Sequence, residues 1–183
     1  VQVGCLTGLI NYIHSPFLSN GKQLIETPTY HVFNMMKHHQ NAECIRTVCA
    51  CEKSHGVDRI SASASLKDGK TLVTLVNTEY SAEAEISVEL HNCEFPENVE
   101  VELLSSGDPH DCNSFEEPEK VRTVTTTVSA SGKTLVVKLP AASVVSLRFD
   151  TPSAYLERTE RIPSYDKIKQ RETHYANGNS IWN

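Results

Sequence analysis

Short apolar runs that alternate with polar residues fill the sequence from residue 60 to residue 150. Over residues 84–90 and 99–103, every second residue is apolar and the residues between them are glutamate or serine. Because successive side chains of a β-strand point to opposite faces, this period of two predicts strands with one buried and one solvated face. Seven or more such strands, about ten residues apart, are typical of an antiparallel β-sandwich or jelly roll. We therefore expect a mainly β fold.

The clearest local prediction in this region is a β-hairpin. Residues 60–66 and 71–76 flank Asp68-Gly69, a dipeptide that favours the tight turn between two antiparallel strands. The other expected elements are a long polar connection over 105–120, a turn over 130–133, and strands over 121–128, 134–139 and 145–149.

The first 26 residues have a different pattern. An apolar run from Val3 to Ile13 favours a buried strand, with the start of a helix as the alternative. Ser15-Pro16 follows, and residues 19–22 (Ser-Asn-Gly-Lys) are typical of a turn. We expect a strand followed by a loop.

Residues 28–40 predict a helix. Thr27 is able to cap its N-terminus, and Pro28 suits the first helical position, where a backbone N–H would have no partner. Apolar residues at 30, 33 and 36 fall on one side of this helix. The residues expected to pack in the core are Tyr30, Phe33, Met35 and Met36.

The three histidines of this helix lack the spacing of a metal site. His31, His38 and His39 are separated by seven, eight and one positions, whereas two ligands from one helix usually lie about three or four apart. We expect no metal ion, a His31 that packs or hydrogen-bonds, and a solvent-facing pair at His38 and His39.

Six cysteines occur at irregular intervals. Free cysteine packs readily as a small apolar residue, so reduced and mostly buried thiols are expected, and one disulfide bridge stays open as an alternative. Cys49-Ala50-Cys51 places two thiols on the same side of an extended segment, without the two-residue spacer of zinc or redox pairs. The cysteines are Cys5, Cys44, Cys49, Cys51, Cys93 and Cys112.

Charge and hydropathy argue against two classes of partner. The net charge is −6, whereas nucleic acids and anionic membranes attract basic surfaces. No apolar run approaches the roughly 20 residues that a membrane-spanning helix needs, and no signal-peptide pattern opens the sequence. We expect neither a nucleic-acid partner nor a membrane partner.

Three blocks of the sequence resemble the α-L-arabinofuranosidases of glycoside hydrolase family 51. Residues 11–27 resemble the eighth strand of the family's barrel and the loop that leaves it. Residues 27–40 contain Thr-Pro-Thr-Tyr-His-Val-Phe, which is the most specific match. The third block comprises residues 71–77, 113–116, Val121 and 139–145, the last of which resembles the family's final sandwich strand.

The resemblance implies a jelly-roll-like β-sandwich preceded by the last strand and helix of a (β/α)8 barrel. Residues 1–43 would be the end of the barrel and the connecting helix, and residues 44–150 would be the sandwich. Residues 151–183 form a polar tail with no counterpart in the family, and we expect them to be loosely packed or disordered.

The resemblance also implies an activity, the retaining hydrolysis of terminal α-L-arabinofuranosyl groups from hemicellulose polysaccharides and oligosaccharides, as in L-arabinose metabolism. This reaction needs a nucleophile and an acid/base, two carboxylates about 5 Å apart. In the family both precede the position of Val1, so this chain would lack the catalytic residues and be inactive alone. The parent enzyme would be a cytoplasmic homo-oligomer that binds arabinofuranosyl-containing saccharides and uses no cofactor and no metal.

Asn11 and His14 are the candidate substrate-binding residues, because residues at the C-terminal end of a barrel strand face the active site. In the family Gln often occupies the position of His14 and reaches the arabinose, and an imidazole also hydrogen-bonds with hydroxyls. A partly buried His14 that holds the loop before Pro16 is the alternative. The carboxylate pairs within the chain are expected at the surface or in turns rather than in a catalytic site. These pairs are Glu83 with Glu85, Asp108 with Asp111, and Glu116 with Glu117.

A non-catalytic carbohydrate-binding or oligomerisation module is the alternative function. Sugar-binding modules use aromatic platforms, but Trp182 lies in the tail, and Tyr80 and Phe95 are isolated in the sequence. Exposed barrel-facing apolar surface on Val3, Leu6 and Ile10 would favour the C-terminal part of an enzyme over such a module.

Overall fold

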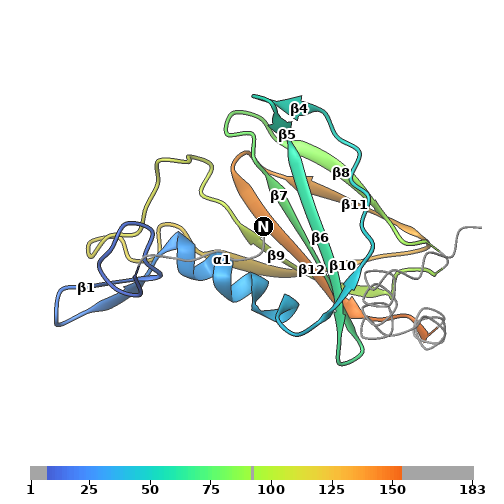
Figure 1. Ribbon diagram of the computed structural model, residues 1–183, viewed down its shortest axis with the longest axis horizontal. Coiled ribbons are helices and arrows are strands. Elements are labelled where there is room, and N and C mark those ends of the chain that lie inside the picture. The colour runs from blue at the N-terminus through green and yellow to red at the C-terminus, as the bar shows by residue number, and fades with distance from the viewer. Residues whose placement is uncertain (1–7, 92, 154–183) are drawn as a thin grey trace, which may run out of the picture.

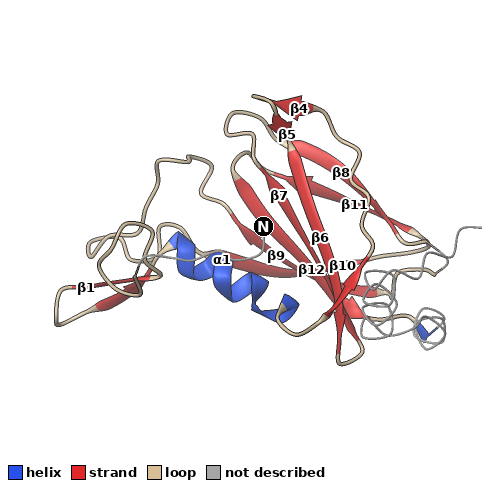
Figure 2. Cartoon of the chain, viewed as in Figure 1, coloured by secondary structure: helices blue, strands red, loops and turns tan. Residues whose placement is uncertain are grey.

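The computed structural model of the chain describes residues 8–91 and 93–153. β-Strands form most of the regular structure, and one helix precedes the long strands (Figure 1, Figure 2). The elements in chain order are β1 (Phe17–Ser19), β2 (Leu24–Glu26), α1 (Pro28–Met36), the 3-10 helix η1 (Lys37–His39), β3 (Glu43–Ile45), β4 (Lys53–Ser54), β5 (Val57–Asp58), β6 (Ile60–Lys67), β7 (Lys70–Asn77), β8 (Ala84–Glu89), β9 (Asn98–Leu104), β10 (Thr123–Ser129), β11 (Thr134–Leu139) and β12 (Ser143–Asp150).

Two antiparallel layers enclose the apolar core. Six strands form one sheet in the order β10-β9-β12-β7-β6-β3, and β8 pairs with β11 in a second, smaller sheet. Val73 and Leu147 of the large sheet share one buried cluster with Leu139 of β11. The prediction of a mainly β fold built as an antiparallel β-sandwich is confirmed.

The β6–β7 hairpin forms where the sequence predicts it. Lys67 pairs with Lys70 across the turn. Asp68 and Gly69 have φ values of 51° and 73°, the left-handed geometry that a two-residue type I′ turn requires at both central positions. The Asp-Gly dipeptide therefore fixes the register of two central strands.

The remaining long strands lie close to the predicted segments, and β11 alternates between exposed and buried positions. β8, β9, β11 and β12 occupy the expected segments, and β8 alternates between half-buried and exposed positions. β10 begins at Thr123 rather than at residue 121. The connection from Ser105 to Arg122 contains no strand. The short strands β1 to β5 were not predicted, because two or three residues carry no period.

α1 begins where expected, and the Thr27 side chain accepts a hydrogen bond from the backbone N–H of Tyr30 at 3.4 Å. The helix lies on the face of the large sheet opposite the apolar core (Figure 1). Met35 is 1% exposed, and it packs there against Leu104 and Val121. The sandwich therefore has a third layer at this face.

The prediction for the buried side of the helix is confirmed in part. Its buried residues are His31 and Met35, one turn apart, whereas Phe33 is 52% exposed. The expectation that Met35 packs in the core is confirmed, Tyr30 and Met36 are half-buried, and the expectation is wrong for Phe33. The sheet beneath the helix selects the stripe that contains Met35, and Phe33 points away from it.

Residues 8–13 do not form the predicted buried strand. Their backbone turns instead: the N–H of Asn11 donates to the carbonyl of Phe17, and the N–H of Ser15 donates to that of Tyr12. One isolated bridge joins Ile10 to Phe17. Because no neighbouring strand among the described residues extends this pairing, the backbone polar groups bond within the turn. The helix alternative fails as well, since Asn11 has a φ of 57°.

Two further predictions concern the cysteines and the chain ends. Cys44, Cys49, Cys51, Cys93 and Cys112 are free thiols. The expectation that they are mostly buried is wrong, since Cys93 alone among these five is buried and most of the others lie in exposed loops. Residues 3–7 of the apolar run, Cys5, and the tail from residue 154 with Trp182 lie outside the described residues. No helix in the described part is long and apolar enough to cross a membrane.

Candidate functional site at the N-terminal junction

Two loops that are distant in sequence meet at the start of α1. The Oγ1 of Thr27 donates to the carbonyl of Ser15 at 2.7 Å. The side-chain amide of Asn113 donates to the carbonyls of Glu26 and Val121, both at 2.8 Å, and its Oδ1 accepts from the N–H of Val121 at 2.7 Å. Asn113 is 3% exposed. We call this meeting of residues 8–27 with residues 105–122 the N-terminal junction.

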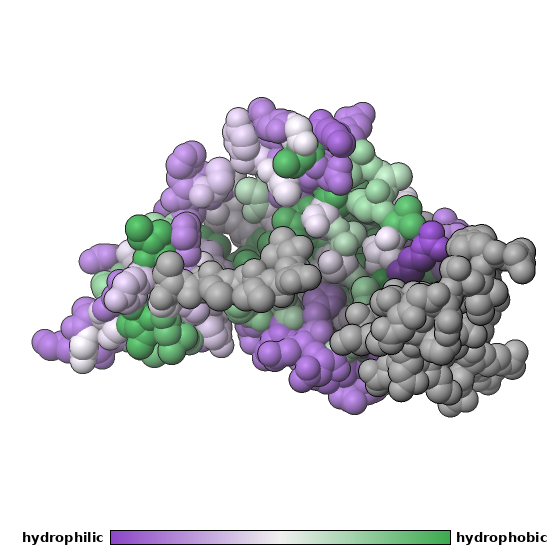
Figure 3. All heavy atoms as spheres, in the orientation of Figure 1, coloured by the Kyte–Doolittle hydropathy of each residue, from purple (hydrophilic) through white to green (hydrophobic). Residues whose placement is uncertain are grey.

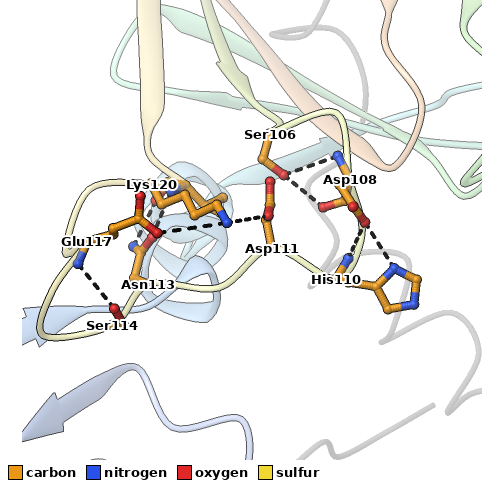
Figure 4. Close-up of polar contacts among 9 residues, drawn as sticks. Ser106, Asp108, His110, Asp111, Asn113, Ser114, Glu117 and Lys120 are labelled. Carbon is orange, nitrogen blue, oxygen red and sulfur yellow. Dashed lines mark hydrogen bonds and ion pairs between the residues drawn. The ribbon is translucent and has the colours of Figure 1, made fainter.

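The loop over 105–122 is held by its own polar side chains (Figure 4). Lys120 Nζ lies 2.7 Å from Asp111 Oδ1, and this hydrogen bond raises the pKa of Lys120. The backbone N–H and the ring Nδ1 of His110 both contact Asp108, and the hydrogen bond from that backbone N–H lowers the pKa of Asp108. Ser114 Oγ accepts from the N–H of Glu117.

These contacts assign the acidic residues of the loop to structural roles. Asp108 stabilises a turn and Asp111 an ion pair, as the turn interpretation of this segment predicts. Glu116 and Glu117 are exposed, and their backbone N–H groups rather than their carboxylates are engaged by Ser114. Lys120 Nζ also lies 4.0 Å from Glu117 Oε2, so Asp111 and Glu117 share one ammonium group and both belong to the ion pairs that hold the loop.

Asn11 holds the turn at the N-terminal junction. Its Nδ2 donates to the carbonyl of Ser19 at 2.9 Å, and its Oδ1 accepts from the N–H of Ser19 at 2.7 Å. Both ends of the amide are thus engaged by the backbone of β1. The left-handed φ of Asn11 is one that asparagine tolerates better than most residues.

His14 lies in the same turn but makes no hydrogen bond in the described structure, and it is exposed. The interpretation of His14 as a partly buried residue that holds the loop is therefore wrong, because Asn11 performs that task. The imidazole is free to hydrogen-bond with a hydroxyl group. The two candidate residues thus share one turn and differ in what their side chains can still bind.

Exposed apolar side chains occur in the turn that carries His14 and on β2. Figure 3 shows apolar residues at the end of the molecule that carries β1. Exposed apolar surfaces are typical of sites that contact another domain, another protein or a ligand. We call this set the apolar patch, and its residues with their exposed fractions are Leu9 (64%), Ile10 (43%), Tyr12 (65%), Ile13 (79%) and Leu24 (59%).

The histidines of the helix differ from the prediction in one respect. His31 is buried, as expected. His39 is not solvent-facing, since its Nδ1 lies 2.7 Å from Ser65 Oγ and its Nε2 lies 3.0 Å from Thr74 Oγ1. His38 is half-buried, and its Nε2 lies 3.5 Å from Arg148 Nη1. Burial first, and His38 second, lower the pKa of His39. No periodic pattern in the sequence predicts this contact, because the two hydroxyl groups belong to residues 26 and 35 positions away.

The other aromatic candidates divide into a core residue and a surface residue. Phe95 is buried and meets Phe149 edge to face, with ring centroids 5.2 Å apart. Tyr80 is 58% exposed and stacks on His55 at 6.2 Å. One exposed ring is a small surface for sugar stacking. Among the described residues, no group of three or more His, Cys, Asp or Glu side chains is placed to hold a metal ion.

Comparison with known proteins gives one consistent result. Residues 1–143 match the family described as the alpha-L-arabinofuranosidase C-terminal domain. An intracellular exo-alpha-L-arabinofuranosidase from Bacteroides ovatus is 34% identical over 154 residues, which cover 80% of this chain and 30% of that protein. The chain therefore spans less than a third of the length of this relative.

Solved structures show the same relationship. The GH51 arabinofuranosidase from Xanthomonas axonopodis pv. citri matches with a TM-score of 0.66 and 30% identity, over 76% of this chain and 29% of that one. An alpha-L-arabinofuranosidase from Thermotoga maritima, solved as an arabinose complex, has a TM-score of 0.68 and 16% identity, over 74% of this chain and 31% of that one. The second likeness concerns the fold alone.

Proposed function

Because the chain belongs to the family of α-L-arabinofuranosidase C-terminal domains, we propose that it is the non-catalytic C-terminal portion of a retaining α-L-arabinofuranosidase. The parent enzyme would release terminal α-L-arabinofuranosyl groups from hemicellulose polysaccharides and oligosaccharides. The observation that carries this proposal is the match over residues 1–143, combined with a relative whose remaining length has no counterpart in this chain.

The acidic residues support the assignment of catalysis to another part of the parent. Retaining hydrolysis needs a nucleophile and an acid/base about 5 Å apart. In the described residues Asp111 pairs with Lys120, Asp108 is engaged by His110, and Glu83 and Glu85 lie at exposed positions. We therefore place both catalytic carboxylates before Val1 in the parent protein.

The apolar patch is the proposed contact with the catalytic barrel. Burying side chains such as Leu9 and Ile13 contributes about 25 cal/mol per Å² of apolar surface, so a barrel packed there would be held firmly. The division into residues 1–43, which would complete the barrel, and residues 44–150, which would form the sandwich beside it, follows from this placement.

His14 is the proposed substrate contact. Its exposed imidazole lies in the turn that Asn11 fixes, and a neutral imidazole both donates and accepts hydrogen bonds with sugar hydroxyls. Asn11 then serves the same site by positioning the turn.

A homo-oligomeric parent is part of the proposal, and so is a cytoplasmic location, which is supported by the word intracellular in the name of the Bacteroides ovatus relative.

A covalent probe tests the proposal. An arabinofuranose-configured epoxide reacts with the nucleophilic carboxylate of a retaining enzyme. The probe is applied to the upstream-extended protein, meaning this chain preceded by its catalytic barrel, and the labelled peptide is identified by mass spectrometry. We expect the label on a carboxylate before Val1. A label on an Asp or Glu of the present chain would overturn the proposal.

A further inference from the structure

The edge of β6 next to β3 is only partly covered. β3 pairs with β6 over three residues, and the last of these pairs joins Ile45 to Ala64. The carbonyl of Arg59 accepts the N–H of Thr78 on the β7 side. Because successive carbonyls of a strand point in opposite directions, the carbonyl of Ile60 points toward the open edge.

Two thiols cover this carbonyl. Cys49 Sγ and Cys51 Sγ both donate to the oxygen of Ile60, at 3.6 Å and 3.5 Å. The two sulfur atoms are therefore neighbours that share one acceptor, and the expectation that the Cys-Ala-Cys segment presents both thiols on one side is confirmed. Burial, and then the charge and hydrogen bond of Cys51, raise the pKa of the Cys49 thiol.

The segment that carries these thiols is open to solvent and free to adjust. Residues 46–50 are exposed, Cys51 is half-buried, and residues 46–52 contain neither helix nor strand. A disulfide needs Cβ atoms about 4 Å apart with a specific torsion, and a coil without a hydrogen-bond ladder can reach that geometry by small backbone rotations. Cys44, a single exposed thiol five residues earlier, has no such neighbour among the described cysteines.

We propose that Cys49 and Cys51 form a dithiol redox site that a low-molecular-weight disulfide, of the glutathione disulfide class, converts to an intramolecular disulfide. The Cys49 thiolate attacks one sulfur of the small disulfide and expels the other half as a thiolate, which takes up a proton. The Cys51 thiolate then attacks the Cys49 sulfur and expels the second half. The protein loses two protons and two electrons, and the small disulfide takes up both to become two thiols.

The oxidation has a structural consequence. A disulfide has no S–H group, so the carbonyl of Ile60 loses both of its thiol donors and must bond with water instead. The open edge of β6 then becomes more accessible at Ile60. Because the thiolate is the attacking species and the Cys49 thiol is held protonated, the rate of oxidation rises as the pH increases above neutrality.

Peptide mapping tests this proposal independently of the enzymatic function. The 183-residue chain is equilibrated with a mixture of reduced glutathione and glutathione disulfide, free thiols are alkylated, and the protein is digested with trypsin. Cleavage after Arg46 and Lys53 yields peptide 47–53, which contains Cys49, Cys51 and no other cysteine. Cleavage after Lys37 and Arg46 yields peptide 38–46, which contains Cys44 alone as an internal control.

We expect peptide 47–53 to lose both alkylation sites and to have the mass of an internal disulfide, while peptide 38–46 carries glutathione. The Cys51→Ser variant should instead retain one glutathione on Cys49, because no second thiol displaces it. Two alkylated cysteines in peptide 47–53 when peptide 38–46 is glutathionylated would overturn the proposal. Two bound glutathiones on peptide 47–53 would overturn it as well.

Discussion

Asn113 donates a hydrogen bond to the carbonyl of Glu26, a residue 87 positions earlier in the chain, at 2.8 Å. The same side chain bonds with both backbone groups of Val121. One buried amide thus fastens the loop before β10 to the residue that precedes the cap of α1, and it holds the two halves of the N-terminal junction together.

Replacing this amide should destabilise the chain. Asn113→Ala leaves the carbonyls of Glu26 and Val121 and the N–H of Val121 without their partner in a buried site, at a cost of about 2–3 kcal/mol in the free energy of unfolding. Urea denaturation followed by circular dichroism measures this change. Asn98→Ala, at an exposed strand position, is the control and should change the unfolding free energy by less than about 0.5 kcal/mol. Equal effects of the two substitutions would contradict the role of Asn113.

Stability should decrease on acidification below neutral pH because of His39. Its folded-state pKa lies below the usual 6.5, so the unfolded chain binds the proton more readily. The stabilisation is complete above about pH 6.5 and is lost as the pH falls through the folded-state pKa. Urea midpoints measured between neutral pH and pH 5 should show this loss.

Variants separate His39 from the other histidines. His39→Gln should flatten the pH dependence, and His38→Gln should flatten it in part, since burial lowers the pKa of His38 also. His91→Gln, at an exposed position, should leave the dependence unchanged. A pH profile of His39→Gln as steep as that of the wild type would show that another group is responsible.

The apolar patch should matter only when a barrel covers it. Leu9→Ser removes an exposed apolar side chain, so the unfolding free energy of the 183-residue chain should change by less than about 0.5 kcal/mol. In the upstream-extended protein the same substitution should lower the melting temperature by several degrees. Val48→Ser, 80% exposed and far from the patch in sequence, is the matched control. Identical melting temperatures of the two extended variants would contradict the proposed contact.

His14 should affect substrate binding rather than folding. In the upstream-extended protein, His14→Ala should raise KM for an arabinofuranoside about 3- to 10-fold, the effect of losing one hydrogen bond to a neutral group. His14→Gln should restore part of this loss, because its amide also bonds with hydroxyls. Steady-state kinetics measure both, and an unchanged KM in His14→Ala would exclude the contact.

The sequence correctly predicted the elements that depend on residues close together in the chain. The type I′ turn at Asp68-Gly69 and the alternation in β8 depend on neighbouring residues, and both form as expected. Thr27 caps α1 for the same reason.

The incorrect predictions concern residues whose burial depends on elements that lie far away in the sequence. The sheet buries Met35, as expected, but it leaves Phe33 exposed, although Phe33 was also expected in the core. Contacts with the hydroxyl groups of Ser65 and Thr74 hold the His39 ring against the large sheet. The apolar run that ends at Ile13 has a composition suited to burial, but no strand among the described residues extends beside it.

The candidate site was identified in part. The sequence singled out Asn11 and His14, but it did not reveal that Asn11 is engaged by Ser19 while His14 is exposed. Asn113 was noted only as part of a family block. Its bond to Glu26 joins residues 87 positions apart, and no local pattern in a single sequence predicts such a pairing.

Hydrolysis of a p-nitrophenyl α-L-arabinofuranoside tests the central claim most directly. The purified 183-residue chain and the upstream-extended protein are assayed side by side at equal molar concentration. We predict hydrolysis by the extended protein and none above the uncatalysed rate by the 183-residue chain. Hydrolysis by the shorter chain would contradict the account, because its own carboxylates would then perform the chemistry.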